Sequence, residues 1–400
     1  MPHPPPSPDT VWNDAARHWS FPPGVTYLNH GSFGPSPEPV LAAFESWTRR
    51  IECEPMQFFL RDLEAAWTDA LHALARFVDA DPDGLIFVDN ATFAMNVVAA
   101  SVPLRRGDGV LLSDHEYGAV RRLWETRCRE AGAQLQIARL PCPIRSTDEV
   151  LEAFQRAASR RTRLLVISHV TSPTALVLPV QAVGDWARQR DILVCIDGPH
   201  ALAMLPLSLK ELPCDFYTAS CHKWLSAPFG SGFLYVAQPH RRAVRPVVRS
   251  WGRSFRGRSP SWKDEFVWLG TRNPAAFLAV PAAIAFLESW GADAARSRMH
   301  QLARDARKRL TALREDIRPI CPDDSTWYAA MCCVELPGPP ARREPLGDPL
   351  QERLWERFRI EVPLTRFGDR RLLRVSCHLY NREADLDRLA EALSELLTAR

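Results

Sequence analysis

The sequence predicts an α/β protein with a mostly parallel central sheet, and three observations support this prediction. Short apolar runs that could each form a buried strand recur along the chain. Amphipathic helical segments separate them, a pattern typical of a parallel sheet covered by helices on both faces. Polar residues follow the runs, where ligands bind in such sheets. The runs are LIFV at 85–88, GVLLS at 109–113, LQIARL at 135–140, RLLVIS at 163–168 and ILVCI at 192–196.

The chain divides into three predicted parts, because the alternating pattern ends after residue 237. A short helix is expected at 11–20, after a proline-rich and disordered arm at 2–8. Residues 37–77 should form two helices with a break near Pro55. A long charged helix at 291–316, strand-like runs and a closing helix indicate a smaller α+β unit. The predicted parts are an N-terminal arm at 1–20, a large domain at 21–275 and a small C-terminal domain at 276–400.

The composition is that of a globular protein and argues against several functions. The net charge of +3 gives no strong attraction to nucleic acid or to anionic membranes. No apolar run approaches the roughly 20 residues that a membrane-spanning helix needs. The ten cysteines include no C-x-x-C pair, and the N-terminus does not resemble a secretory signal. We therefore expect reduced thiols and a cytoplasmic protein, with neither a disulfide framework nor a metal site.

A lysine in the segment 215–236 is the first candidate for chemistry. Two β-rich runs, DFYTAS and GFLYV, flank a loop that contains Lys223 among small residues. A lysine just past the end of a strand can form a Schiff base with an aldehyde cofactor, and Ser220 and His222 beside it could hold a phosphate group. Taken alone, Lys223 could also be a solvated surface charge.

Two further segments carry groups that suit the same cofactor. Asp197 ends an apolar run, so its carboxylate could pair with a protonated pyridine nitrogen or could cap the next turn. Asn90, Ala91 and Thr92 open a helix, whose free N–H groups and Thr92 hydroxyl could bind phosphate. The alternative for this second segment is an ordinary helix N-cap.

Four other residues have both a functional and a structural interpretation. His115 follows a strand and could stack on a planar cofactor or be a satisfied polar residue. Ser172 and His200 could donate to a phenolic oxygen or be turn residues. Arg374, in the alternating run RLLRVS, could bind a carboxylate with two hydrogen bonds or be a surface charge. One cofactor would account for all of these groups together.

An early loop gives candidates for substrate binding. The run VTYL leads into NHGSFGP, residues 29–35, which can continue neither as a strand nor as a helix. The loop is either a plain turn or a substrate loop, and in the second case Asn29 and His30 are its candidate binding residues.

Taken together, these motifs resemble those of one known family. They are NHGSFGP, NATFAMNVV, LLSDHEYGAVRR, SHVTSPTALVLPV, DGPHA, CDFYTASCHKWLSAP, WLGTRN and LRVSCHLYN. The set resembles the class V aminotransferase family of pyridoxal-phosphate enzymes, and most of all its isopenicillin-N epimerase branch. The resemblance covers nearly the whole chain from Tyr27. It implies fold type I, with a seven-stranded sheet in the large domain, and a homodimer with the active site between large and small domains.

The resemblance also implies roles for the candidate residues. Lys223 would bind the aldehyde of pyridoxal 5'-phosphate, Asp197 would pair with the pyridinium nitrogen, and His115 would stack on the ring. Ser172, where many members have asparagine, and His200 would lie near the phenolic oxygen. The residues implied for the phosphate are Ala91, Thr92, Ser220 and His222, with Thr271 from the partner subunit.

The activity implied is that of an enzyme acting at the α-carbon of an amino acid or an amino-acid-containing substrate. Arg374 would bind the α-carboxylate, and Lys223 would move the α-proton. The carbanion formed could lead to epimerisation or transamination, with β-elimination by a C–S lyase as the alternative. Cysteine desulfuration is disfavoured, because PLTRFGDRR just before Arg374 contains no cysteine and Cys332 and Cys333 lie too far upstream.

An arginine-rich run at 241–258 supports a hypothesis of a different class, a non-enzymatic nucleic-acid-binding protein. The nearly balanced charge and the sparse aromatic residues disfavour it. The run lies between Lys223 and Thr271, so we expect its loop at 249–258 to border the active site. Arg253 and Arg256 would then bind a distal anionic group of the substrate. A solvated surface loop is the alternative.

Overall fold

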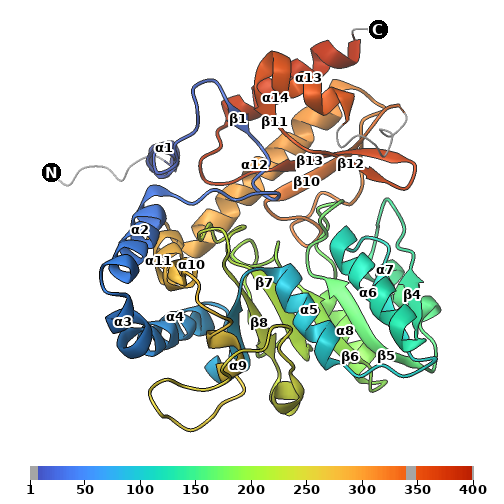
Figure 1. Cartoon of the computed structure of the whole chain (residues 1–400). Helices are drawn as coiled ribbons and strands as arrows, with labels where there is room; N and C mark the ends of the chain where they lie inside the picture. Colours follow the sequence, from blue (N-terminus) through green and yellow to red (C-terminus); the bar gives the residue numbers. More distant parts are fainter. Residues whose placement is uncertain (1–7, 339–347, 399–400) are drawn as a thin grey trace, which may run out of the picture.

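The computed structural model describes residues 8–338 and 348–398, with a seven-stranded sheet at its centre (Figure 1). The strand order is β2-β8-β7-β6-β5-β3-β4, in which β8 is antiparallel to both neighbours and the other pairs are parallel. The strands are β2 (Leu85–Val88), β3 (Gly109–Ser113), β4 (Gln134–Ala138), β5 (Thr162–Ser168), β6 (Leu193–Asp197), β7 (Phe216–Ser220) and β8 (Gly232–Val236). The predicted α/β class is confirmed.

Alternate residues of each strand enter two separate cores, one on each face of the sheet. Ile86 and Val88 share a core with α5 (Ala91–Ser101) and α6 (Gly118–Ala131). Leu85 and Phe87 belong to the larger core. Because both faces are covered, the strands are apolar at nearly every position. The helices that contribute to the larger core include α4 (Leu63–Phe77), α7 (Thr147–Ala157), α8 (Val180–Arg188) and α11 (Val280–Ser289).

The two predicted helices at 37–77 are present, with their break where proline requires it. The first is α2 (Glu38–Cys53), and Glu54 then leaves the helical region with φ −141° and ψ 66°. The residue before a proline is disfavoured in the α conformation, which explains the break before Pro55. The chain resumes through α3 (Pro55–Gln57) and the π-helical turn η1 (Phe58–Asp62) into α4.

A four-stranded antiparallel sheet of order β12-β13-β10-β9 forms the second layer of the molecule, above the large sheet in Figure 1. Helix α12 (Ala292–Leu313) packs on β10 and α14. The strands and remaining helices are β9 (Arg318–Pro319), β10 (Met331–Leu336), α13 (Pro349–Phe358), β12 (Leu364–Phe367), β13 (Arg370–Ser376) and α14 (Glu383–Thr398).

The N-terminal segment joins the C-terminal part of the chain. β1 (Thr26–Tyr27) pairs in parallel with β11 (Ile360–Glu361), and Asn29 bridges to Ser376 at the end of β13. The short helix α10 (Ala275–Leu278) and then α11 pack on α2 and α4, whereas α12 reaches the small sheet. None of these contacts tests the predicted domain boundary at 275/276, which stays a prediction.

The predicted arm at 2–8 lies almost wholly outside the described residues. The predicted helix at 11–20 is shifted in the structure, where α1 covers Pro8–Ala16. Within the described ranges no single helix is long and apolar enough to cross a membrane, although the bent pair Ala275–Ser289 and Ala292–Leu313 meets that test by length and composition. The same ranges contain no group of three or more residues arranged to hold a metal ion.

Candidate active site

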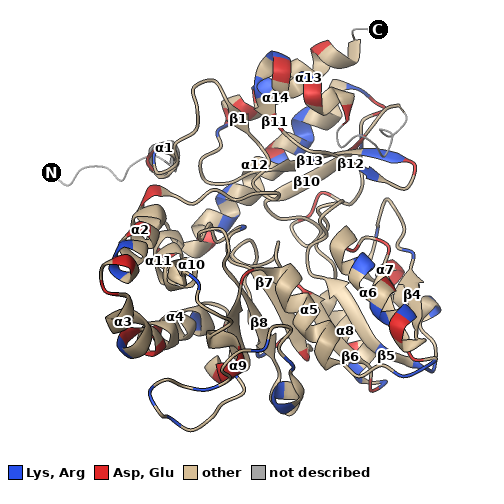
Figure 2. Ribbon diagram, viewed as in Figure 1, with Lys and Arg blue, Asp and Glu red and all other residues tan. Residues whose placement is uncertain are grey.

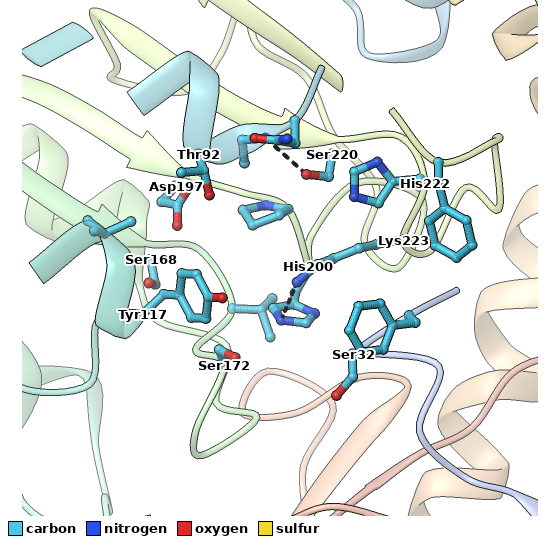
Figure 3. Close-up of a pocket in the computed structure, with 18 of the residues that line it drawn as sticks. Ser32, Thr92, Tyr117, Ser168, Ser172, Asp197, His200, Ser220, His222 and Lys223 are labelled. Atoms are coloured by element: carbon cyan, nitrogen blue, oxygen red, sulfur yellow. Dashed lines mark hydrogen bonds between the residues drawn. The ribbon is translucent and has the colours of Figure 1, made fainter. Parts of the chain in front are cut away.

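A cavity of about 460 Å³ opens at the carboxyl ends of the parallel strands (Figure 3). Such a position is where ligands bind in open α/β sheets. Loops that follow β2, β3, β5, β6 and β7 line it, together with part of the early loop at 29–35 and one residue of β13. The cavity brings together nine predicted site residues, which are Ala91, Thr92, Ser172, Asp197, His200, Ser220, His222, Lys223 and Arg374.

Lys223 projects into this cavity from the loop that follows β7. Its Nζ lies 3.2 Å from Nε2 of His200. Burial, and next the positive charge of Arg374, lower the pKa of Lys223 to about 8, while the Asp197 carboxylate opposes the shift. Near neutral pH the fraction of Lys223 that is uncharged amine, the form that attacks an aldehyde, is therefore much larger than for an ordinary lysine.

Asp197 ends β6 at the floor of the cavity and is almost fully buried. One carboxylate oxygen, Oδ1, accepts a hydrogen bond from the Thr218 hydroxyl at 2.5 Å. Burial raises the pKa of Asp197 to about 6, against the opposing effects of the Thr218 hydrogen bond and the Lys223 charge. A bound cation, such as a protonated ring nitrogen, would favour the ionised carboxylate.

The start of α5 and the end of β7 form a cradle for an anion. The side chain of Asn90 caps α5 by accepting from the Phe93 N–H at 2.9 Å, and Ser220 Oγ accepts from the Ala91 N–H at 3.0 Å. A Cβ at Gly232 would lie 2.6 Å from the Ala219 carbonyl and 3.0 Å from the Asn90 Cα, so only glycine permits this close approach.

His222 completes this cradle. Its Nδ1 is buried and has no hydrogen-bond partner among the described residues. His222 and Thr92 both line the cavity beside the N-terminus of α5, where N–H groups point outward. This arrangement fits a phosphate group.

Arg374 is a buried cation without an acidic partner in the part of the chain that the structure describes. It is 3% exposed, and burial lowers its pKa to about 10. One terminal nitrogen donates to the Ser172 carbonyl at 2.6 Å, and the other donates to Ser32 Oγ at 2.8 Å and, more weakly, to Asn29 Oδ1 at 3.4 Å. The remaining donor, Nε, has no partner among the described residues. A substrate carboxylate would supply the missing negative charge.

The structure does not bring His115 into the cavity, contrary to the expectation that it stacks on a cofactor. Its ring is fully buried, its Nδ1 lies 2.8 Å from Thr174 Oγ1, and its centroid is 4.2 Å from that of Phe367 in β12. Burial lowers the pKa of His115 to about 3. The aromatic residue of this loop that does line the cavity is Tyr117, whose ring points inward in Figure 3.

The substrate-binding interpretation of Asn29 and His30 also needs correction, because neither lines the cavity. Asn29 contacts Arg374, and His30 is buried with its Nε2 3.1 Å from the Lys223 carbonyl and its Nδ1 3.0 Å from the Tyr380 hydroxyl. Both side chains thus position residues that reach the cavity. The following residues of the loop, Gly31, Ser32 and Phe33, line the cavity themselves.

The sequence suggests that the loop at 249–258 borders the active site. In the structure this loop does not border the cavity of its own chain. Arg253 stacks over the Trp251 ring at 4.9 Å, and Arg256 donates to the Arg61 carbonyl. Both are exposed, as is Thr271, and none of the three lines the cavity. Figure 2 shows this loop, with its arginines in blue, projecting from the part of the molecule that contains the large sheet. The predicted contacts of these three residues with a substrate or cofactor therefore stay predictions.

Sequence reasoning missed Glu116, a carboxyl group buried close to Asp197. Its two oxygens accept hydrogen bonds from the Ser113 hydroxyl at 2.6 Å and the Ser168 hydroxyl at 2.5 Å. Ser168 itself lines the cavity and lies beside Asp197 in the register of β5 and β6. Only its position one residue beyond His115 in the strand-end loop could have indicated Glu116.

Comparisons with known proteins agree with this geometry. Residues 27–345 match the model of the family described as Aminotransferase class-V. The chain is 42% identical to isopenicillin N epimerase of Amycolatopsis lactamdurans, over 97% of this chain and 99% of that protein. It is 36% identical to isopenicillin N epimerase of Streptomyces clavuligerus, over 96% and 98%. A probable chloroplastic L-cysteine desulfhydrase of Arabidopsis thaliana is 29% identical over 94% of this chain and 83% of that protein.

Solved structures of low sequence identity share the fold. A mutant of C-DES with glycine covalently linked to its PLP cofactor superimposes with a TM-score of 0.79 at 21% identity, covering 93% of this chain and 97% of that one. The cysteine desulfurase CsdA from Escherichia coli gives a TM-score of 0.78 at 22% identity, covering 97% and 98%.

The residues of the cavity fit pyridoxal 5'-phosphate on their own geometry. The cradle of Ser220, His222 and the α5 N-terminus suits its phosphate, the buried Asp197 carboxylate suits its ring nitrogen, and the Lys223 amine suits its aldehyde. Fold, sequence and site thus lead to one assignment. The chain belongs to the class V aminotransferase family of pyridoxal-phosphate enzymes.

Proposed function

We propose that the protein epimerises the α-carbon of an amino acid or of an amino-acid-containing substrate. The observation that carries the proposal is the presence, in one cavity, of a buried Arg374 with no acidic partner among the described residues and of the Lys223 amine of lowered pKa. A carboxylate held by Arg374 would place the neighbouring α-carbon in the same cavity as Lys223. The similarity to two isopenicillin N epimerases over nearly the full length supports epimerisation as the outcome.

Each residue has a physical task in this reaction. Arg374, aligned by Ser32 and Ser172, binds and orients the α-carboxylate. Lys223 accepts the α-proton at its Nζ, and inversion then requires a proton to reach the opposite face of the α-carbon, because return to the same face would restore the original configuration. Asp197 holds a proton on the cofactor's ring nitrogen by its negative charge, and pyridoxal 5'-phosphate, when bound, supplies the electron sink that acidifies the α-C–H bond.

The experiment that tests the proposal follows both the α-proton and the product. The purified holoenzyme is incubated in deuterated water with a panel of L- and D-amino acids, and mass spectrometry and chiral chromatography follow the products. We expect deuterium at the α-carbon together with inversion and a retained amino group. Formation of a keto acid or of an elimination product without inversion would contradict the proposal.

A C–S lyase activity is the second candidate, supported by the relatives named as L-cysteine desulfhydrases. β-Elimination would use the same Lys223, Asp197 and Arg374. A desulfurase that carries sulfur on a cysteine is disfavoured, because no cysteine is among the residues that line the cavity. Cys332 and Cys333 are buried within β10. Sulfide release from cysteine, measured beside the inversion assay, separates these two functions.

The proposal includes a homodimer with shared active sites, working in the cytoplasm. Support comes from exposed apolar residues near the segment that the resemblance assigns to the partner's site, namely Val247, Val248 and Trp251. The ten free cysteines are consistent with a reducing compartment. Sedimentation at assay concentration should show a dimer, and mixing inactive Lys223→Ala subunits with inactive Thr271→Val subunits should restore activity. A fully active monomer would exclude shared sites.

A further inference from the structure

The indole of Trp224 donates a hydrogen bond to an imidazole that lies beside Lys223. Trp224 follows Lys223 and is 1% exposed. Its Nε1–H donates to Nδ1 of His200 at 3.1 Å, and on the other side of the same imidazole Nε2 lies 3.2 Å from Lys223 Nζ. Indole, imidazole and amine therefore form a continuous chain of three groups that ends in the cavity.

The direction of this chain follows from the donor capacities of its members. An indole nitrogen can only donate, so Nδ1 of His200 must be the accepting, unprotonated nitrogen. Burial lowers the pKa of His200 well below its usual value, so the ring is neutral and carries its one proton on Nε2. The Nε2–H then points to Lys223 Nζ, which can accept a hydrogen bond only as an uncharged amine.

We infer that Trp224 is a positioning residue that fixes His200 as the Nε2–H tautomer and thereby favours the neutral amine form of Lys223, the form that condenses with an aldehyde. The role toward the cofactor rests on the proposed function, since the same Nε2–H would face the phenolic oxygen once the cofactor occupies the cavity. Without the indole N–H, either tautomer of His200 could form and an ammonium at Lys223 could donate to Nε2.

The surroundings hold the indole in this orientation. The Trp224 carbonyl lies 3.3 Å from Nε2 of His378, and the Trp224 ring packs against His30 at 5.1 Å between centroids. His30 in turn contacts the Lys223 carbonyl. The loop is thus fixed from both the N-terminal segment and the C-terminal part of the chain.

Other titratable groups also lie near Lys223 and influence its pKa, whether or not the Trp224 indole is present. Arg374 on β13 lowers its pKa and Asp197 on β6 raises it. His222 on the same loop is neutral at physiological pH, since burial lowers its pKa to about 4. None of these groups contacts the Trp224 indole in the described structure, so a change at Trp224 isolates the contribution of the His200 tautomer.

The tautomer can be measured in the wild-type protein. Nitrogen-15 NMR of the cofactor-free full-length chain distinguishes the protonated from the unprotonated ring nitrogen of each of the eleven histidines. The His200 signals are assigned by their absence from His200→Gln. We expect protonated Nε2 and unprotonated Nδ1. The reverse tautomer would overturn the inference without any variant of Trp224.

The effect on Lys223 is tested in Trp224→Phe, which keeps an aromatic ring but has no N–H. Competitive acylation with mass spectrometry gives the pH dependence of labelling for each of the four lysines in the cofactor-free chain. The Lys223 midpoint should rise by about half a pH unit or more in the variant. The matched control is Trp19→Phe, since this buried indole donates to the Pro35 carbonyl and does not contact His200.

The control should leave the Lys223 midpoint unchanged, and Lys210, Lys263 and Lys308 serve as internal references in every sample. Thermal unfolding shows whether Trp224→Phe is folded. An unchanged Lys223 midpoint in a folded variant would overturn the inference. This outcome is distinct from failure of the proposed function, which the inversion assay of the wild type decides.

Discussion

The Arg374 guanidinium lies 2.8 Å from the Ser32 hydroxyl, although 342 positions separate these residues in the chain. Parallel pairing of β1 with β11 and the bridge between Asn29 and Ser376 bring the two segments together. The early loop thereby fixes one terminal nitrogen of the guanidinium, and the Ser172 carbonyl fixes the other. The arginine is thus oriented before any carboxylate arrives, which reduces the entropic cost of binding.

Arg374→Lys should lower kcat/KM by about 10²-fold or more, mainly through a higher KM. A lysine keeps the charge, but its ammonium group lacks the planar fork with which a guanidinium binds a carboxylate through two parallel hydrogen bonds. The matched control is Arg371→Lys on the same strand, whose guanidinium pairs with Asp348 away from the cavity. Steady-state kinetics of both variants test this, and equal losses in the two would contradict a specific role for Arg374.

Asp197→Asn should retain the cofactor and lose about 10²-fold or more in kcat. A neutral amide cannot hold the proton on the ring nitrogen electrostatically, so the electron sink weakens. Cofactor content is measured by absorbance, and turnover by the inversion assay. Thr218→Val, which removes the hydroxyl that donates to Asp197, should have a smaller effect. Turnover near that of the wild type in Asp197→Asn would refute the role.

Substitution of Tyr117 should affect cofactor binding, whereas substitution of His115 should affect stability. Tyr117→Ala should weaken cofactor binding, because its ring lines the cavity. His115→Ala should lower the free energy of unfolding, because His115 is buried against Phe367 and Thr174. Equilibrium titration with pyridoxal 5'-phosphate and urea unfolding of the cofactor-free variants measure the two effects. A large loss of affinity in His115→Ala, with none in Tyr117→Ala, would restore the stacking role of His115.

Glu116 should make stability depend on pH. Burial is the main cause that raises its pKa from 4.5 to about 7, and the Asp197 carboxylate adds to the shift. The folded state therefore binds this proton more tightly than the unfolded chain does. The resulting stabilisation is complete below pH 4.5 and is lost as the pH rises to about 7.

Glu116→Gln keeps a neutral side chain at every pH. Relative to the wild type it should therefore gain about 1 kcal/mol or more in free energy of unfolding between about pH 4.5 and 7.5. Urea denaturation of the cofactor-free protein measures this difference. Glu125→Gln on α6, where the carboxylate is exposed and pairs with Arg121, should show no such trend. Identical pH profiles for the two variants would contradict the assignment.

The central sheet could be predicted because burial on both faces leaves a direct pattern in the sequence. LIFV and GVLLS became β2 and β3 with the same boundaries. The direction of β8 could not be read, since GFLYV is equally compatible with a parallel or an antiparallel neighbour. Pairing of β1 with β11 joins residues more than three hundred positions apart, and local patterns contain no information on such contacts.

Asp197 at the end of β6 and Lys223 in the loop after β7 both line the cavity, because strand ends in such a sheet face the site. His115 was misplaced because sequence position gives the loop but not the direction of each side chain. In the turn after β3 the chain directs His115 toward Phe367, Glu116 toward Ser168 and Tyr117 into the cavity. Arg253 and Arg256 were placed near the cavity from their position in the sequence, but the loop packs against Glu64 instead.

The most direct test of the account uses the scarcity of lysine in this chain. There are four lysines, and three of them, Lys210, Lys263 and Lys308, do not line the cavity. Borohydride reduction of the holoenzyme, followed by tryptic digestion and mass spectrometry, should place a pyridoxyl phosphate label on Lys223. The label should also block cleavage there, so that it appears in the peptide spanning 211–241. A label on any of the other three lysines, or none on Lys223, would contradict the account.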